Sequence, residues 1–420
     1  MHFWQILNID FHGNESSKTG DQSRGSFTPS TRRSSSYVSA DARPGWPLLG
    51  RSSSLPDEES KEKKKLSVVE WAMNLPDRSM QSPPRSAASE FPLSKCRWLS
   101  YRELNEAVSG FHQDNMIGNG GSNRVYKGTL RGNPVALRIQ NSSEEARKEF
   151  ALEVDIVTSL KHRNVASLVG ICVEEKNLIS VYDYMPRGTL EENLKRKSAL
   201  PWSARFTIAI EIAEAVNYLH SKCLKPVIHR DIKSSNILLT NDFKPKLSDF
   251  GLAIWGPTRT PFISHADAVG TFGYIAPEYF MHGKVSDKVD VYAYGVVLLE
   301  LLSGRKPIDG RKQGSLVMWA NPILESKNYT AIVDPDLQGK FDTGQVKRVA
   351  VAAKLCLKRS PGLRPTMSEI LRLLRGEKWR RKTLSQEDDD DDDIYPSFRT
   401  DLYLAFAMRE IEESSKNLSR

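Results

Sequence analysis

Three short stretches near the middle of the chain carry acidic and amide side chains that can bind cations or accept protons. His229-Arg230-Asp231 is followed by Asn236, Asp249-Phe250-Gly251 comes next, and Ala276-Pro277-Glu278 follows. Far upstream lies a glycine-rich turn, 118–121, where glycines would let backbone N–H groups approach phosphate oxygens. Each stretch alone is common in proteins, and a glycine-rich turn alone usually binds nothing. Their order and spacing together favour a site that binds a phosphate-bearing ligand.

The elements that must position these residues fall into two groups. Short β-type runs are predicted at 115–120, 123–130, 133–140, 166–173 and 177–185, with an amphipathic helix at 142–160. An earlier helix begins with a capping-box pattern, Ser100 with Glu103. From Pro201 onward the pattern is helical, at 203–220, 289–304, 343–357 and 366–376. A small antiparallel sheet with one helix, followed by a helical lobe, predicts an α+β fold with a cleft between the lobes.

The remaining residues form an arm and a tail. Residues 1–97 are predicted to be a mostly disordered Ser/Arg-rich arm, interrupted by a short docking helix near 66–76. In that segment Val68, Val69, Trp71, Ala72 and Leu75 would lie along one side of a helix. Residues 98–375 are predicted to be the folded domain, with an N-lobe at about 98–185 and a C-lobe at about 186–375. Residues 376–420, which include six aspartates at 388–393, are predicted to be a charged and largely disordered tail.

Charge, cysteine spacing and apolar runs limit the kinds of site this chain can carry and its expected location in the cell. The formal net charge is +8, and the four cysteines form no C-x-x-C pair, which argues against a zinc site or a disulfide framework. No run of eighteen apolar residues predicts a transmembrane helix, and His2 excludes N-myristoylation. We expect a cytoplasmic protein, with the nucleus as an alternative, and only indirect membrane contact. The basic arm could bind nucleic acid or anionic lipid, but it lacks interleaved aromatics, so no nucleic-acid partner is expected.

The motifs together resemble the protein kinases, and specifically the plant receptor-like kinases and receptor-like cytoplasmic kinases of the receptor-like kinase/Pelle group. The resemblance covers Trp98 to Arg375 and rests on LSYRELNEAVSGFHQDNMIGNGG, VYDYMPRGTLEENL, HRDIKSSNILL, GTFGYIAPEY and DVYAYGVVLLELLSGRKP. It implies a bilobal protein-kinase fold, ATP and Mg²⁺ as cofactors, and protein substrates or signalling partners. Lys233 and Thr271 are similar to residues of serine/threonine kinases, so the resemblance implies transfer of phosphate to Ser or Thr hydroxyls.

The resemblance also implies roles for individual residues. Asp231 would accept or orient the proton of the substrate hydroxyl, and Lys233 would contact the transferred phosphate. Asn236 and Asp249 would hold magnesium, which prefers oxygen ligands. Arg138 and Glu153 would form the ion pair between the third strand and the following helix. The nucleotide would be bound by Ile117, Gly118, Gly120, Gly121, Val125, Ala136, Arg138, Tyr184, Met185 and Leu238.

Other residues would support the fold or its regulation. Glu278 would pair with Arg364, Asp290 would brace the catalytic loop, and Tyr182 would stand at the back of the nucleotide pocket. His229, Phe250, Val157 and Leu168 would stack between the lobes. Arg230 could pair with a phosphate added to an activation-loop hydroxyl, for which the candidates are Thr258, Thr260, Ser264 and Thr271.

Two positions depart from the kinase pattern. The third strand reads Val135-Ala136-Leu137-Arg138, with arginine where kinases carry lysine, and Asn123 replaces the third glycine of the loop. Guanidinium is planar and bulkier than ammonium, so the exchange is not conservative at such a site. A misplacement of about 1 Å can cost roughly 10²-fold in rate. Lys127, on the neighbouring strand, is a poor substitute because lysine is ordinary there in this family.

Two functions therefore stay open after the sequence analysis. The complete set of Asp231, Asn236 and Asp249 favours an active serine/threonine kinase, with Arg138 as a change that could slow it. Arg138 and Asn123 favour the alternative, a catalytically impaired pseudokinase that acts as a signalling scaffold or a nucleotide-binding module.

Overall fold

The computed structural model describes residues 96–120, 123–174, 176–196, 200–258, 260–265, 268–309 and 314–377. The predictions for the arm with its docking helix, for Gly121 and for nearly all of the tail lie outside these residues.

The described chain begins with a six-stranded sheet in the order β1-β5-β6-β4-β3-β2, in which only the β1–β5 pair is parallel. The five predicted β-type runs are confirmed as β2 to β6, and β1 is an addition. Between β3 and β4, Arg131 and Gly132 both have positive φ, 53° and 83°, as a two-residue hairpin turn requires. The strands are β1 Arg97–Trp98, β2 Met116–Gly120, β3 Asn123–Leu130, β4 Asn133–Asn141, β5 Leu168–Val173 and β6 Asn177–Asp183.

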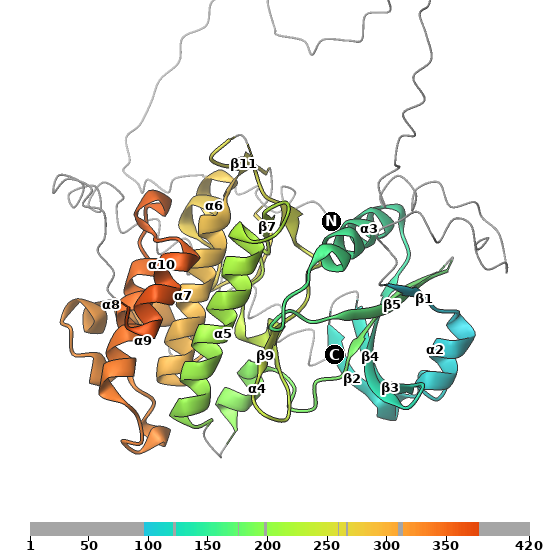
Figure 1. Cartoon of the computed structure of the whole chain (residues 1–420), viewed down its shortest axis with the longest axis horizontal. Helices are drawn as coiled ribbons and strands as arrows, with labels where there is room; N and C mark the ends of the chain where they lie inside the picture. The colour runs from blue at the N-terminus through green and yellow to red at the C-terminus, as the bar shows by residue number, and fades with distance from the viewer. Residues whose placement is uncertain are drawn as a thin grey trace, which may run out of the picture. The chain divides into compact units, whose positions relative to one another are not determined.

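Two helices pack on opposite faces of this sheet (Figure 1). Helix α2, Tyr101–Ala107, has the predicted capping box of Ser100 and Glu103 and packs on the face that carries Leu137 and Ile139. Helix α3, Glu144–Ser159, packs on the other face. Because side chains alternate along a strand, Arg138 points to the opposite face from Leu137 and Ile139, which is the face of α3.

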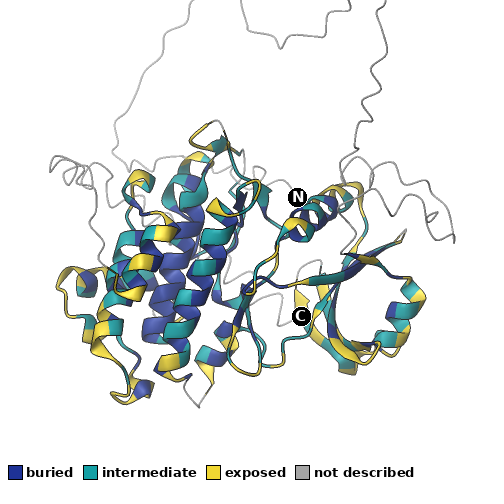
Figure 2. Cartoon of the chain, in the orientation of Figure 1, coloured by how far each residue is buried: buried dark blue, intermediate teal, exposed yellow. Residues whose placement is uncertain are grey.

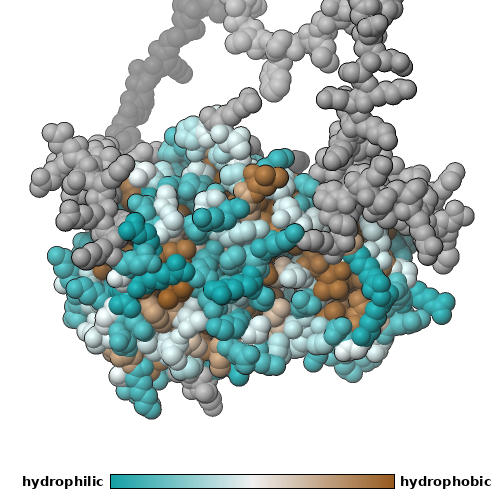
Figure 3. Space-filling model, viewed as in Figure 1, coloured by the Kyte–Doolittle hydropathy of each residue, from teal (hydrophilic) through white to brown (hydrophobic). Residues whose placement is uncertain are grey.

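The rest of the described chain is mainly helical, and the four helices predicted after Pro201 are confirmed as α5, α7, α9 and α10. Helix α7 is buried on nearly every side and lies at the centre of the largest hydrophobic core (Figure 2). In Figure 3 the viewed surface is mostly hydrophilic over these helices, and hydrophobic residues gather over the sheet where Figure 1 labels β4 and β5. The helices are α4 Leu190–Lys195, α5 Trp202–Ser221, α6 Pro277–His282, α7 Asp287–Ser303, α8 Leu316–Glu325, α9 Thr343–Cys356 and α10 Met367–Arg375.

Short strands and 3-10 helices connect these elements and carry the catalytic motifs. The strands are β7 Val227–Ile228, β8 Ile237–Leu239, β9 Pro245–Leu247, β10 Ile254–Trp255, β11 Ile263–Ser264, β12 Lys284–Val285, β13 Ile308–Asp309 and β14 Gly314–Ser315. The 3-10 helices are η3 Gln113–Asn115, η4 Ser234–Asn236, η5 Tyr329–Ile332, η6 Pro335–Leu337 and η7 Pro361–Leu363. The segments on either side of β8 and β9 place Asn236 and Asp249 close to the catalytic loop.

Helix α7 approaches α9 closely at Gly295, where an added Cβ would lie 2.7 Å from the Cβ of Cys356. We predict that Gly295→Val lowers the free energy of unfolding by about 1–3 kcal/mol through overpacking, measured by chemical denaturation. Gly362→Ala is the control, because its Cβ would meet nothing closer than 4.0 Å. Equal stability of Gly295→Val and wild type would contradict this account of the α7–α9 packing.

Candidate active site

The guanidinium of Arg138 lies between two carboxylates from different parts of the chain. Its Nη1 donates to Asp249 Oδ1 at 2.8 Å, and its Nη2 donates to Glu153 Oε2. The Arg138 side chain is 12% exposed and that of Glu153 is 3% exposed, whereas that of Asp249 is 45% exposed. The predicted Arg138–Glu153 pair is thus present, and the bond to Asp249 is an interaction that the sequence analysis did not foresee.

Tyr182 completes the polar contacts of Glu153. Its hydroxyl donates to Glu153 Oε1 at 2.9 Å, so both carboxylate oxygens have a partner. Burial, together with the negative charge of Glu153, raises the pKa of Tyr182 well above its ordinary value. For Arg138 burial alone would lower the pKa, but attraction to Glu153 and Asp249 raises it. The guanidinium therefore stays charged and compensates two carboxylates at once.

A second polar network surrounds Asp231 in the catalytic loop. Thr271 Oγ1 donates to Asp231 Oδ1 at 2.7 Å, and Lys233 Nζ lies 2.7 Å from Asp231 Oδ2. Asn236 Nδ2 donates to both the carbonyl and Oδ2 of Asp231 at 2.9 Å. Lys233 also donates to Thr271 Oγ1 at 2.7 Å. The structure therefore brings together Asp231, Lys233 and Asn236, with Thr271 as the fourth member.

The backbone of the catalytic loop is fixed by a buried carboxylate. Asp290 on α7 accepts hydrogen bonds from the backbone N–H groups of His229 and Arg230 at 2.8 and 2.9 Å. Burial alone would raise the pKa of Asp290, but hydrogen bonds and attraction, chiefly from His220, lower it below its ordinary value. This position confirms the predicted bracing role of Asp290. Arg230 and Asp249 both have positive φ, 64° and 59°, which costs free energy in non-glycine residues and is common at functional sites.

Hydrophobic contacts join the two parts of the site. The rings of His229 and Phe250 lie 4.7 Å apart, and Phe250 belongs to one core with Val157, against which Leu168 packs. His229 Nε2 also lies 3.1 Å from the Ser248 carbonyl oxygen. These contacts agree with the predicted stack.

The predicted magnesium ligands present oxygen atoms of the right kind. The two hydrogen bonds from Asn236 Nδ2 to Asp231 direct the amide oxygen away from Asp231, and Asp249 has one carboxylate oxygen beyond the bond to Arg138. Ser248, next to Asp249, donates to the Asn236 carbonyl through both its backbone N–H and its Oγ at 2.9 Å. Within the described ranges no group of three or more His, Cys, Asp or Glu could hold a metal. A site with one carboxylate and one amide fits Mg²⁺ that is shared with phosphates and water.

The described residues predicted to contact the nucleotide lie on strands β2, β3, β4 and β8 and in the segment that follows β6. In the β3–β4 register, Val125 pairs with Arg138 and Lys127 pairs with Ala136. On β2, Ile117 is half exposed and Gly118 lies against Val125. Gly118 and Gly120 are in β2, Tyr184 and Met185 follow β6, and Leu238 is in β8. Lys127 Nζ lies 4.6 Å from the centre of the Tyr184 ring, so in this arrangement its amine is at the hinge. It does not take the place of Arg138.

The activation segment shows which hydroxyls are accessible. Thr258, Thr260 and Ser264 are exposed, whereas Thr271 is bonded to Asp231 and Lys233. Arg230 Nε donates to the Leu252 carbonyl at 2.6 Å, and Nη1 lies 3.4 Å from the Tyr279 hydroxyl. Its pairing with a phosphate stays a prediction.

Two further polar contacts lie outside these networks. The predicted pair of Glu278 and Arg364 is confirmed as a two-pronged contact at 2.6 and 2.7 Å. Sequence reasoning missed Glu300, which is buried and accepts from Ser234 Oγ at 2.7 Å and from the Tyr274 hydroxyl at 2.8 Å. Its signal was a lone glutamate in the apolar run VVLLELL. Burial raises the pKa of Glu300 to about 8, although the two hydrogen bonds lower it.

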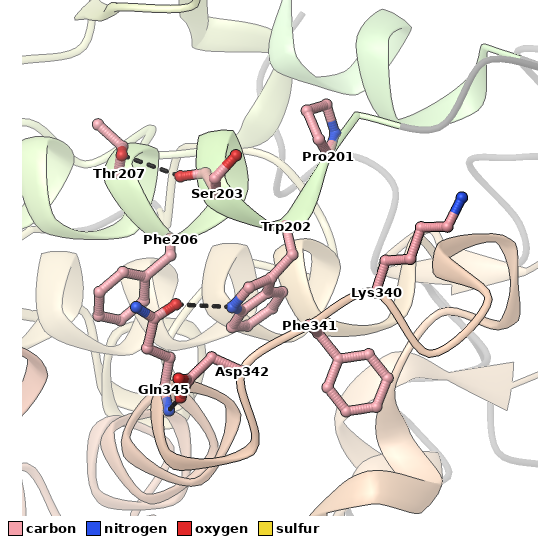
Figure 4. A pocket seen from close by; sticks show the side chains of 9 residues that line it. All are labelled: Pro201, Trp202, Ser203, Phe206, Thr207, Lys340, Phe341, Asp342 and Gln345. Carbon is pink, nitrogen blue, oxygen red and sulfur yellow. Dashed lines mark hydrogen bonds between the residues drawn. The ribbon is translucent and has the colours of Figure 1, made fainter.

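A separate hollow of about 540 Å³ lies elsewhere, at the start of α5 and α9 (Figure 4). The indole N–H of Trp202 donates there to Gln345 Oε1 at 2.8 Å. None of the predicted site residues lines this hollow, so we assign it no part in the chemistry.

The protonation of Glu300 gives a pH test of the network. Burial raises the pKa of Glu300 from 4.5 to about 8, so the Glu300 carboxyl ionises at lower pH in the unfolded chain than in the folded chain. The free energy of unfolding therefore falls as the pH rises between these two values. We predict that Glu300→Gln removes this loss, so the variant gains stability relative to wild type as pH rises from 5 to 8, by up to about 1.4 kcal/mol per unit. Chemical denaturation at several pH values measures the effect. A pH-independent difference would show that Glu300 is ionised in the folded protein.

Comparisons with known proteins agree with this geometry. The protein kinase domain family matches residues 111–373. "Protein kinase STUNTED" of Arabidopsis thaliana is 45% identical over 97% of this chain and 69% of its own length. "Probable receptor-like serine/threonine-protein kinase At5g57670" is 39% identical over 72% of this chain and 53% of its own length.

A third relative from the same plant is "Receptor-like cytosolic serine/threonine-protein kinase RBK1", 40% identical over 70% of this chain and 65% of its length. The chain thus spans only about half to two thirds of the length of these relatives. The family match covers more than half of the chain, and the catalytic motifs occupy the expected elements. The chain belongs to the protein kinases, among the plant receptor-like cytoplasmic kinases.

Proposed function

We propose that the protein transfers the γ-phosphate of ATP to serine or threonine hydroxyls of protein substrates, with Mg²⁺ as the metal. The observation that carries the proposal is the buried network in which Lys233, Asn236 and Thr271 all contact the Asp231 carboxylate. Phosphoryl transfer depends on positioning and charge neutralisation more than on covalent chemistry. A carboxylate held by three partners is positioned in this way.

In this mechanism each side chain has one task. Asp231 accepts or orients the proton of the substrate hydroxyl. To reach the Asp231 carboxylate, this hydroxyl takes the place of Thr271 or of Lys233 as a hydrogen-bond donor. Lys233 then faces the transferred phosphate as a compact positive charge. When bound, ATP would supply the phosphoryl group, and Mg²⁺ would supply positive charge that neutralises the phosphate oxygens. Asn236 and Asp249 would hold the metal through oxygen atoms.

The nucleotide would lie between the sheet and β8. In this proposal Ile117, Gly118, Gly120, Val125 and Ala136 cover it from the sheet. Tyr184 and Met185 contact the base from the hinge, and Leu238 contacts it from below. Arg138 would face the phosphates while it keeps its ion pair with Glu153.

One observation favours a second candidate, a nucleotide-binding or scaffolding module with little transfer activity. Both terminal nitrogens of Arg138 donate to carboxylates, one of them on Asp249. Phosphates that approach Arg138 therefore compete with Asp249, a proposed metal ligand. Binding of nucleotide can survive such competition better than transfer, because transfer needs reacting atoms within a fraction of an ångström.

The cytoplasm is the location that we propose, since one relative is named as a cytosolic kinase. No observation favours the nucleus. Among the residues for which the structure gives positions, no helix is long and apolar enough to cross a membrane. The substrates and signalling partners that we propose are proteins.

The role of Asp231 is tested by Asp231→Asn, which keeps the shape of the side chain but removes its charge. We predict that the rate of phosphate transfer falls by about 10²–10⁴-fold, the usual contribution of a positioned base. Transfer of radiolabelled phosphate to a generic protein substrate measures the rate. Asp242→Asn is the matched control, because Asp242 is exposed in a turn. Equal rates for wild type and Asp231→Asn would remove the enzyme proposal and leave the module.

The role of Arg138 is tested by Arg138→Lys. If the guanidinium limits transfer, lysine should raise the rate by roughly 10²-fold, because ammonium fits between carboxylate and phosphate. Nucleotide affinity, measured separately by calorimetry, should change much less. Arg124→Lys, on an exposed position of β3, is the matched control. A lower rate in Arg138→Lys would mean that the site is adapted to arginine.

A further inference from the structure

A hollow of about 420 Å³ lies at the end of α3, on the loop that leads to β5. Its apolar lining comes from the end of α3 and the start of β5, and basic side chains lie along the loop. The lining residues are Val157, Thr158, Leu160, Lys161, His162, Arg163, Val165, Ala166, Ser167 and Leu168. Leu160 and Leu168 are the apolar lining residues that stay partly exposed, whereas Val157, Val165 and Ala166 are buried, and Arg163 already pairs with Glu214 at 2.6 Å. A partly apolar hollow of this kind suits an apolar anchor side chain.

The hollow is held open by bonds to the helical part of the chain. Ala166 N donates to the Leu247 carbonyl and Leu247 N to the Asn164 carbonyl, both at 2.8 Å. Lys161 N donates to the Tyr218 hydroxyl at 2.8 Å. The loop is therefore fixed at both ends, and a ligand would meet a preformed surface.

The hollow is also linked to the active site through α3. Glu153, the partner of Arg138, lies one turn before Val157, which lines the hollow and shares a core with Phe250. Any group that fills the hollow packs against this turn of α3. Such packing would hold Glu153 in its bond to Arg138.

The described chain starts beside this hollow. Cys96 is buried in a cluster with Phe150 and Val154 of α3, and Leu168, a lining residue, packs against the same cluster. The first described residue, Cys96, therefore shares a cluster with a residue that lines the hollow. The 45% identity with the first relative extends over 97% of the chain, so it includes most of the arm as well as the kinase domain.

The arm contains a segment with an apolar side, Leu66–Pro76. Its apolar residues, among them Trp71 and Leu75, fall mainly on one side at helical spacing, whereas Glu70 and the adjacent Asp77 fall on the opposite side. Between this segment and Cys96 lie residues 77–95, which can span up to about 60 Å when extended. Reach is therefore no obstacle.

We propose that Leu66–Pro76 binds in the hollow behind α3, with Trp71 as its main anchor, and holds α3 where Glu153 reaches Arg138. The docking itself stands apart from the proposed activity, and only its effect on Glu153 rests on the proposed function. A buried aromatic anchor of this kind is typical of segments that dock in pockets.

Hydrogen exchange of the full chain tests the docking without any nucleotide. In Trp71→Ala we expect amide exchange in residues 157–168 to be at least about threefold faster, because local opening there becomes easier. Trp46→Ala is the matched control, since it removes a tryptophan from the same arm outside the segment. Unchanged exchange in Trp71→Ala, or an equal change in both variants, would overturn the proposal.

Cross-linking identifies the occupant. Ala72→Cys combined with Ser167→Cys, an exposed lining residue, should form an intramolecular disulfide on mild oxidation, mapped by mass spectrometry. Ser54→Cys with Ser167→Cys should not. A disulfide that forms only between two copies would mean that the segment in the hollow comes from a second molecule and not from the same chain. No preference for Ala72→Cys over Ser54→Cys would refute docking of the segment. These outcomes stand whether or not the protein transfers phosphate.

Discussion

Two carboxylates from different lobes meet one buried guanidinium, and the polar link between the sheet and the segment after β9 depends on that contact. An unpaired charge in a protein interior costs several kcal/mol, so Glu153 needs its cation wherever α3 packs. Arg138 supplies the cation from β4 and extends it to Asp249. A lysine has one nitrogen with which to serve both carboxylates, whereas arginine has two in a fixed plane. Both terminal nitrogens of Arg138 are therefore engaged by carboxylates, one from each lobe.

The catalytic loop relies on a different balance, between strained backbone and buried acceptors. Arg230 and Asp249 have left-handed backbone conformations, which cost about 1–3 kcal/mol each in non-glycine residues. Asp290 holds the first through two backbone N–H groups, and Arg138 contacts the side chain of the second. Helix α7 presents this buried carboxylate from a position in which it is packed on nearly every side. A helix of the core therefore fixes the backbone of the catalytic loop.

Much of this arrangement was readable from sequence because its signals are local. The capping box at Ser100 acts over a few residues, and β-type runs followed by helical runs predicted two lobes, which the resemblance to the protein kinases also implied. The bond from Arg138 to Asp249 could not be predicted, because it joins residues that only the closed fold brings together. The Thr271 bond to Asp231 and the buried Glu300 belong to the same class. For each of them the sequence supplied the residue, and only tertiary packing decided its partner.

The site contains two polar networks that are built from different residues. The Asp231 network is complete without Arg138, since its partners come from the catalytic loop and from Thr271. The Arg138 network is complete without Asp231, since it joins β4, α3 and Asp249. Asp249 and Asn236 connect them, through the bonds of Ser248 to the Asn236 carbonyl. A change at Arg138 therefore reaches the Asp231 network through Asp249, Ser248 and Asn236.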